Sequence, residues 1–156
     1  EAFWMKKGIL GDTVPLELNA KELVHRNNKN SELTVYGYTP MMVSVQCVQK
    51  TMDHCNHACV QYVLKDRYQK EFRGVCSCEF CYNTIYNTLP TSLLKEKEKA
   101  EKLGVKAYRL SFTIETQQET EKIVRAFVDV YLRGQKPDGQ MQTEETTKGH
   151  FQRGVE

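Results

Sequence analysis

Residues 107–134 read AYRLSFTIETQQETEKIVRAFVDVYLRG, and this stretch decides the fold class. Its first part, Ala107–Thr113, predicts a strand, and the residues that follow predict a helix. A strand followed by an amphipathic helix is the unit from which parallel sheets are built. Five apolar residues recur at steps of three and four and form one stripe along the predicted helix: Ile123, Ala126, Phe127, Val130 and Tyr131.

The same alternation appears upstream. Thr13–Leu18 (TVPLEL) predicts a short buried strand, and Asn19 is suited to cap the helix AKELVHRN that follows. Leu33–Tyr38 (LTVYGY) is rich in β-branched and aromatic residues and predicts a second strand. The segment SLLKEKEKAEKLG at 92–104 predicts another helix, whose charge run is most simply a solvated face.

These patterns predict an α/β fold with three or four parallel strands. A complete (β/α)₈ barrel needs about 250 residues, so we expect the C-terminal strands and helices of a partial TIM-type barrel over residues 1–133. A cysteine-rich insertion at 41–82 interrupts it, and QYVLKDRYQKEFRGV at 61–75 predicts a β-hairpin there. The tail, 134–156, lacks periodicity and predicts a loop or flexible end.

Composition excludes several classes of protein. The 22 basic and 20 acidic residues leave a formal net charge of +2, which argues against binding nucleic acid by charge alone. No apolar run is long enough to span a membrane, and no signal peptide is visible, so we expect a cytoplasmic protein. The chain starts at Glu1 within an apparent helix, and we expect barrel strands before it or an oligomer partner beside it.

All six cysteines lie between positions 47 and 81. Disulfides are typical of small secreted domains, in which the cysteines are spread along the chain to link distant loops. Clustered cysteines instead favour metal binding, because several thiolates must lie close to one metal centre. Cys78 and Cys81 form C-x-x-C, and Cys47 and Cys55 offer a second pair. His54 and His57 lie in the same segment. The spacing alone leaves iron–sulfur, zinc and buried structural cysteines open.

Several stretches resemble the C-terminal part of the bacterial U-32 family, the collagenase-like peptidases. The stretches that carry the resemblance are VYGYTPMMVSVQC (35–47), KDRYQKEF (65–72), CEFCYNTIYN (78–87), LGVKAYRLSFTIET (103–116) and KGHFQRGVE (148–156). The resemblance runs in order from about Leu10 to Glu156. It implies the later strands of a bacterial barrel enzyme with a protein or peptide substrate.

The resemblance also implies a cofactor. Other members of this family are oxygen-independent hydroxylases of tRNA, ribosomal RNA or a quinone precursor, and they hold a 4Fe-4S cluster on four cysteines. By position, the implied ligands here are Cys47, Cys55, Cys78 and Cys81, with Cys59 and Cys76 spare. Zinc on the same cysteines is the alternative cofactor, and a noncatalytic binding domain stapled by metal is the alternative function.

The sequence does not identify catalytic residues. It contains neither HExxH nor GxSxG, so peptide hydrolysis rests on the resemblance alone. Glu17, at the end of the first predicted strand, is a candidate for substrate or proton handling, because barrel active sites lie at the C-terminal ends of strands. Arg153 is a second candidate, which we expect to fold back over the barrel mouth and meet an anion.

Overall fold

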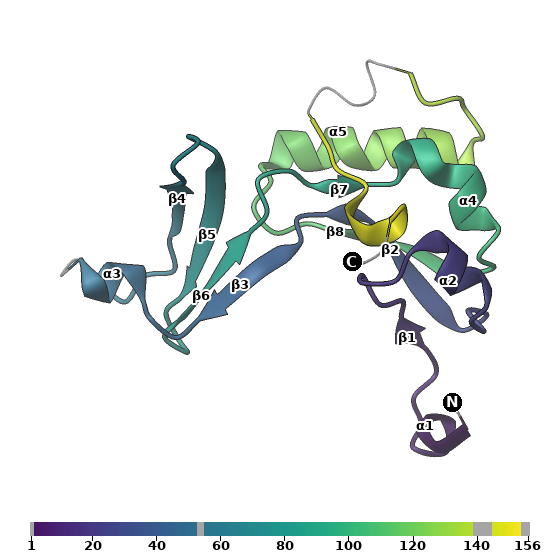
Figure 1. Ribbon diagram of the computed structural model, residues 1–156, viewed down its shortest axis with the longest axis horizontal. Coiled ribbons are helices and arrows are strands. Elements are labelled where there is room, and N and C mark those ends of the chain that lie inside the picture. The colour runs from purple at the N-terminus through teal and green to yellow at the C-terminus, as the bar shows by residue number, and fades with distance from the viewer. Residues whose placement is uncertain (1, 53–54, 139–144, 154–156) are drawn as a thin grey trace. The chain divides into compact units, whose positions relative to one another are not determined.

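A computed structural model describes residues 2–52, 55–138 and 145–153 (Figure 1). The chain forms two compact units. Unit 1 comprises Glu1–Gly37, Thr91–Phe112 and Thr116–Glu156, and unit 2 comprises Tyr38–Pro90 and Thr113–Glu115. The fold is mixed α/β, as predicted, and the described residues contain no closed barrel. The predicted insertion, 41–82, falls inside unit 2.

Unit 1 is built on a four-stranded sheet. Its central strand, β2 (Ser31–Gly37), pairs in parallel with β1 (Asp12–Thr13) and β8 (Ala107–Ser111) and antiparallel with β7 (Thr91–Ser92). The parallel pairing confirms the prediction from the strand and helix pattern. Leu33 and Val35 of β2 are buried.

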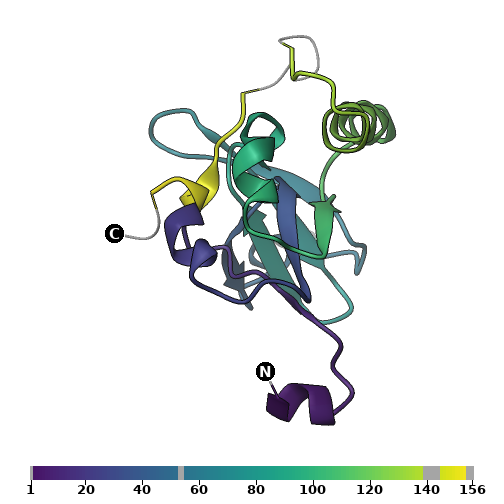
Figure 2. The ribbon, with the colours of Figure 1, turned by 90° about the vertical axis from the view of Figure 1, so that its right-hand side faces the viewer.

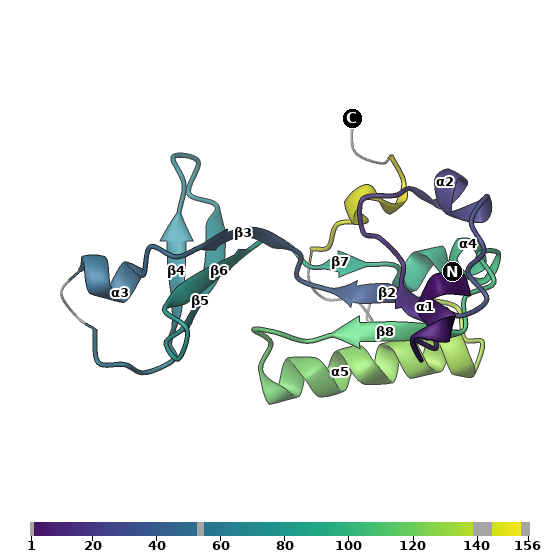
Figure 3. The ribbon, with the colours of Figure 1, turned by 90° about the horizontal axis from the view of Figure 1, so that it is seen from below.

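Helices pack against this sheet, and Leu33 and Val35 share one hydrophobic core with Phe127 and Val130. The longest, α5 (Gln117–Phe127), runs alongside β8 (Figures 1 and 3) and continues as a π-helical turn, η2 (Val128–Leu132). Its capping box joins Thr116 and Glu119 through reciprocal hydrogen bonds. The remaining helices of unit 1 are short: α1 (Ala2–Lys6), α2 (Ala20–Val24), η1 (Leu94–Glu96), α4 (Lys97–Glu101) and η3 (Gly149–Phe151).

The first predicted strand is wrong beyond Thr13. The strand β1 is only Asp12–Thr13, and residues 16–18 form a turn and bend. Pro15 explains the early end, since proline has no backbone N–H to donate to a neighbouring strand. Asn19 caps α2 as predicted, because its side chain accepts hydrogen bonds from the backbone N–H groups of Lys21 and Glu22.

The tail is more ordered than its composition predicts. Within 145–153, Thr147 forms a parallel bridge with Thr91, and its carbonyl accepts a hydrogen bond of 2.8 Å from the Ser92 N–H. Phe151 joins the hydrophobic core of unit 1 and is 7% exposed. The prediction of a loop or flexible end missed this single aromatic anchor.

Unit 2 is an antiparallel sheet with the strand order β3-β6-β5-β4 (Figure 3). The predicted hairpin is confirmed as β4 (Gln61–Lys65) and β5 (Glu71–Ser77). The carboxylate of Asp66 holds the hairpin turn, because it accepts hydrogen bonds from the N–H groups of Tyr68 and Lys70 at 2.7 and 2.9 Å. The other elements of unit 2 are β3 (Pro40–Ser44), α3 (Val48–Thr51) and β6 (Tyr82–Tyr86).

Across the described ranges, none of the helices combines the length and apolar character needed to cross a bilayer.

Candidate functional site

Four of the six cysteines of unit 2 lie on three different local structures. Cys47 is the residue before α3, Cys76 lies within β5, and Cys78 and Cys81 lie in the turn between β5 and β6. All six cysteines of the chain are free thiols. The site therefore has no covalent link between its parts, and only folding brings them together.

Three of these sulfurs form a chain. The Cys76 sulfur lies 3.5 Å from that of Cys47 and 3.6 Å from that of Cys78. Cys76 has no exposed surface, and Cys47 is 8% exposed. Cys78 donates a hydrogen bond of 2.8 Å to the carbonyl of Ala58. Segments far apart in the sequence thus place soft, metal-binding donor atoms within touching distance.

The C-x-x-C segment forms a tight hairpin turn. The last residues paired across β5 and β6 are Ser77 and Tyr82, so CEFC makes the whole connection. Cys81 adopts a left-handed conformation with φ of 51°, and its sulfur lies 3.7 Å from the Cys78 carbonyl. Such a turn presents two sulfurs on one short loop, as the sequence predicts.

The pKa values of the two buried thiols, Cys47 and Cys76, are shifted in opposite directions. The pKa of Cys47 is lowered, first by the backbone N–H of Lys50 within α3 and then by the Cys76 side chain. Burial and the neighbouring sulfurs raise the pKa of Cys76 to about 12. Cys47 is therefore the sulfur better prepared to act as a thiolate, and Cys76 is held as a thiol in this arrangement.

The structure gathers only part of the predicted ligand set. Cys47 and Cys78 both touch Cys76, which the sequence analysis left as spare. Cys55 and Cys59 are exposed, and in the part of the chain described here neither has a sulfur contact with another cysteine. The described residues contain no group of three or more side chains arranged as a formed metal site.

The two histidines add little to this picture. His54 lies outside the described residues. His57 is exposed, with φ of 56°, and makes no hydrogen bond to a cysteine within the described ranges. A peptidase dyad of cysteine and histidine would need such a bond or a close approach to it.

The two weak catalytic candidates lie on the surface of unit 1. Glu17 is exposed in the turn before Asn19, not at the end of a strand as predicted. Arg153 is exposed just after η3. Neither has an ion pair with any residue that the structure describes.

A polar row that the sequence analysis missed crosses the sheet of unit 1. One oxygen of Glu32 on β2 accepts hydrogen bonds from Thr13 of β1 at 2.8 Å and from Arg109 of β8 at 2.5 Å. These two bonds lower the pKa of Glu32. The strand register explains the row, since Thr34 opposes Arg109 and residues two apart share a face.

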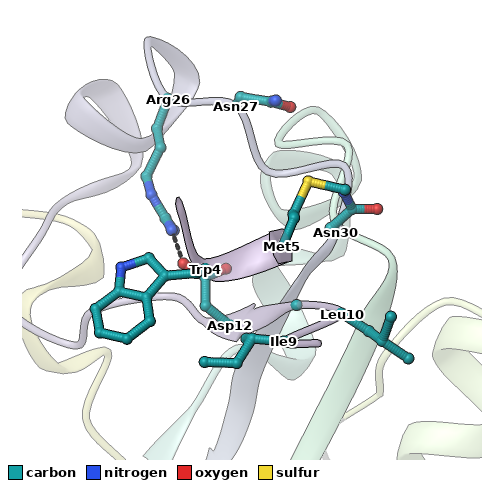
Figure 4. A pocket seen from close by; sticks show the side chains of 9 residues that line it. Trp4, Met5, Ile9, Leu10, Asp12, Arg26, Asn27 and Asn30 are labelled. Atoms are coloured by element: carbon teal, nitrogen blue, oxygen red, sulfur yellow. Dashed lines mark hydrogen bonds and ion pairs between the residues drawn. The ribbon is translucent and has the colours of Figure 1, made fainter. Parts of the chain in front are cut away.

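A cavity of about 520 Å³ lies elsewhere in unit 1, beside α1 (Figure 4). Trp4, Met5 and Leu10 line it together with Arg26, which forms an ion pair with Asp12. The apolar side chains that line it are 45–82% exposed, and α1 itself lies apart from the sheet and helices of unit 1 (Figure 2). Walls so open do not fix a ligand, and no predicted site residue lines this cavity.

The geometry of unit 2 is therefore the chemically distinctive feature of the described chain. Comparison with protein-family models, with curated proteins and with solved structures finds no match to this chain.

Proposed function

We propose that the chain is part of a U-32-type enzyme, labelled collagenase-like peptidase, whose unit 2 carries a thiolate-bound metal centre. The observation that supports this most directly is the approach of Cys47 and Cys78 to Cys76, at 3.5 and 3.6 Å, in a unit without disulfides. Buried, free and mutually close thiols are what a soft metal needs. In this proposal unit 1 supplies the later strands of a (β/α) barrel.

The residues of this site suit an iron–sulfur cluster, because such clusters are held by cysteine thiolates. Cys47, Cys78 and Cys81 are three of the four ligands that the resemblance implies, and they lie at the start of α3 and in the β5–β6 turn. Cys55, in the segment between α3 and β4, is the fourth. When bound, such a cluster supplies one-electron redox chemistry. The protein's part is to hold the thiolates and to exclude water from Cys47.

Hydroxylation of RNA or of a small aromatic compound is the reaction favoured over peptide hydrolysis. Within the described residues, His57 makes no hydrogen bond to a cysteine, so the nucleophile and base of a cysteine peptidase are not paired. A soft-metal centre has no need of that pair. The substrate in this proposal is an RNA or a quinone precursor, with a peptide as the alternative.

A zinc site is the second candidate, because of the sulfur distances. Ligands at about 2.3 Å around one tetrahedral ion are about 3.8 Å apart, close to the two distances around Cys76. In a four-iron cluster each thiolate binds a different iron, so its sulfurs must lie further apart. A single zinc on Cys47, Cys76 and Cys78 would make unit 2 a noncatalytic binding domain held together by metal.

Anaerobic purification followed by iron, sulfide and zinc analysis tests the proposal. We expect stoichiometric iron and sulfide with broad visible absorbance, both lost in Cys47→Ser and Cys78→Ser. Cys59→Ser is the matched control, because Cys59 lies in the same unit, is exposed and has no sulfur contact with another cysteine in the described ranges.

Each outcome separates the candidates. If the protein contains zinc but no sulfide, and the zinc is lost in Cys76→Ser, the noncatalytic domain is supported and the hydroxylase proposal is contradicted. Protein that binds neither metal under anaerobic reconstitution contradicts both. Gelatin cleavage that is unchanged in Cys47→Ser would return the assignment to a peptidase without a metal centre.

A further inference from the structure

Cys76 is the central sulfur of unit 2, and the ligand set proposed for a cluster leaves it without a role. Its sulfur contacts those of Cys47 and Cys78 at 3.5 and 3.6 Å, and the residue has no exposed surface. A buried cysteine is often only a small apolar residue of a core. A buried cysteine that touches two other free thiols can also react with them.

Asn83 holds the backbone next to Cys47 against Cys76. It lies opposite Cys76 on β6, it is 1% exposed, and its side-chain amide donates a hydrogen bond of 2.8 Å to the carbonyl of Gln46. Ser44 of β3 pairs with the same Asn83. Strand pairing and one buried hydrogen bond therefore bring the sulfurs of Cys47 and Cys76 together.

The geometry favours Cys47 over Cys78 as the partner of Cys76 in a disulfide. Cys76 and Cys78 flank Ser77, the last residue of β5, and residues two apart along a strand are separated by about 6.6–6.8 Å. That separation is at the upper limit of the range of about 4.4–6.8 Å between the Cα atoms of a disulfide. Cys47 comes from a separate segment, and its sulfur needs to approach that of Cys76 by only about 1.5 Å to reach the bond length of about 2.05 Å.

We propose that Cys76 is the resolving thiol for Cys47, and that the two form a reversible disulfide when hydrogen peroxide oxidises the metal-free chain. Cys47 is 8% exposed, the more accessible of the pair, and meets the oxidant first. Its sulfur takes one peroxide oxygen as the O–O bond breaks, which gives a sulfenic acid and one water. The Cys76 sulfur then attacks this sulfenic acid, loses its proton and displaces the oxygen as a second water. Two thiols are thus oxidised to one disulfide, and one hydrogen peroxide is reduced to two waters.

This disulfide protects Cys47 from irreversible oxidation. A sulfenic acid without a neighbouring thiol is oxidised further to a sulfinic acid, which ordinary reductants do not restore. A disulfide, by contrast, is returned to two thiols by exchange with a thiol reductant. The inference concerns the chain without metal, so it goes beyond the proposed function and does not rest on it.

Peptide mapping of the reduced, metal-free full chain after one equivalent of hydrogen peroxide tests the proposal. The remaining thiols are blocked with N-ethylmaleimide, and trypsin then leaves Cys47 on the peptide 30–50 and Cys76 on the peptide 74–95. We expect these two peptides to be linked, two of the six free thiols to be lost, and dithiothreitol to reverse both changes.

Variants identify the partner of Cys47, because the peptide 74–95 also contains Cys78 and Cys81. The link should persist in Cys78→Ser and in Cys81→Ser and disappear in Cys76→Ser. In Cys76→Ser, peroxide should convert Cys47 to sulfinic acid at least about fivefold more than in the wild type. If Cys76→Ser does not fold, Cys76→Ala, which buries no hydroxyl, gives the same comparison.

Cys59→Ser is the matched control. Cys59 lies in the same unit, is exposed, and makes no sulfur contact with another cysteine across the residues that the structure describes. Its variant should form the link between 30–50 and 74–95 as the wild type does.

Three results would overturn the inference. The first is a link that is lost in Cys78→Ser or Cys81→Ser and kept in Cys76→Ser. The second is a disulfide found mainly on the peptide 51–65, which carries Cys55 and Cys59. The third is an equal yield of Cys47 sulfinic acid in the wild type and in Cys76→Ser. Because iron, sulfide and zinc are measured on a separate anaerobic sample, each result leaves the proposed metal centre to its own test.

Discussion

The sulfurs of Cys47 and Cys76 lie 3.5 Å apart, although 29 positions separate them in the sequence. The tertiary fold of unit 2 therefore brings the pair together, since one sulfur precedes α3 and the other lies inside β5. The pair is buried from solvent, whereas Cys55, Cys59 and Cys81 are exposed. This difference in burial makes a prediction about thiol reactivity.

In metal-free, reduced protein, iodoacetamide should modify the cysteines in two groups. Cys55, Cys59 and Cys81 should react at rates close to those of the unfolded chain, because they are exposed. Cys76 should react at least about tenfold more slowly, because burial blocks it and keeps it as a thiol. Mass spectrometry of peptides after timed quenching gives each rate, and protein unfolded in urea is the control. Modification of Cys76 as fast as Cys59 would contradict the burial described here.

The acid stability of unit 1 should depend on Glu96. Burial raises the pKa of this carboxyl, but hydrogen bonds from Lys148 and Lys99 outweigh that effect and lower it overall. A lowered pKa in the folded state means that the stabilisation is complete above the unfolded value of about 4.3. It is lost as the pH falls through the folded pKa.

Glu96→Gln should therefore lower the free energy of unfolding by about 1–3 kcal/mol at neutral pH and flatten its dependence on acid. Glu101→Gln is the matched control in the same helical segment. Its ion pair with Lys97, at 3.4 Å, joins a half-exposed carboxylate, so the change should be below about 0.5 kcal/mol. Urea unfolding at several pH values measures both. Equal slopes for wild type and Glu96→Gln in acid would contradict the assignment.

Packing of the tail against unit 1 should depend on Phe151. This residue is 7% exposed and belongs to the core, and its neighbour Gln152 is exposed. Phe151→Ala should destabilise unit 1 by about 3 kcal/mol, as large aromatic deletions in cores do. Gln152→Ala should stay within about 0.5 kcal/mol. Hydrogen exchange should show that Ser92 loses protection in the first variant, because its N–H donates to Thr147. If hydrogen exchange at Ser92 is the same in Phe151→Ala as in the wild type, the packing of Phe151 does not hold the tail against β7, and the prediction is wrong.

Local sequence signals predicted the elements whose determinants are local. The helix now called α5 was predicted by its apolar period, which repeats every three or four residues, and the structure adds a capping box at Thr116. The hairpin of β4 and β5 was predicted by its polar turn. The strand predicted to reach Leu18 failed because Pro15 removes a donor, a local signal that was present and not weighed.

The parts that could not be predicted depend on register between distant strands. Cys76 contacts Cys47 and Cys78 because β5 is aligned so that Cys76 opposes Asn83. A shift of one residue would turn it to the other face. The same register places Tyr62 opposite Gly74 and Asn83 opposite Cys76 on one face of this sheet. The cluster of cysteines was visible in the sequence, but which of them meet was not.

Gly37 provides a test of backbone fit at the C-terminal end of β2. Its φ is +152°, and an added Cβ would lie 2.6 Å from the carbonyl oxygen of Ser111 on β8. That oxygen belongs to the backbone of the neighbouring parallel strand, so it cannot move aside as a flexible side chain would. Gly37→Ala should therefore lower the free energy of unfolding of unit 1 by more than about 2 kcal/mol, because strain and overpacking add.

Gly104→Ala is the control that separates these two effects. Gly104 also has a positive φ, +62°, but an added Cβ there would meet nothing within 4 Å. Its substitution should show the conformational effect alone, about 1 kcal/mol. Urea unfolding of both variants, followed by circular dichroism, gives the comparison. If Gly37→Ala is no more destabilised than Gly104→Ala, the close approach of β2 and β8 at Ser111 is wrong, and with it the pairing of Gly37 with Ser111.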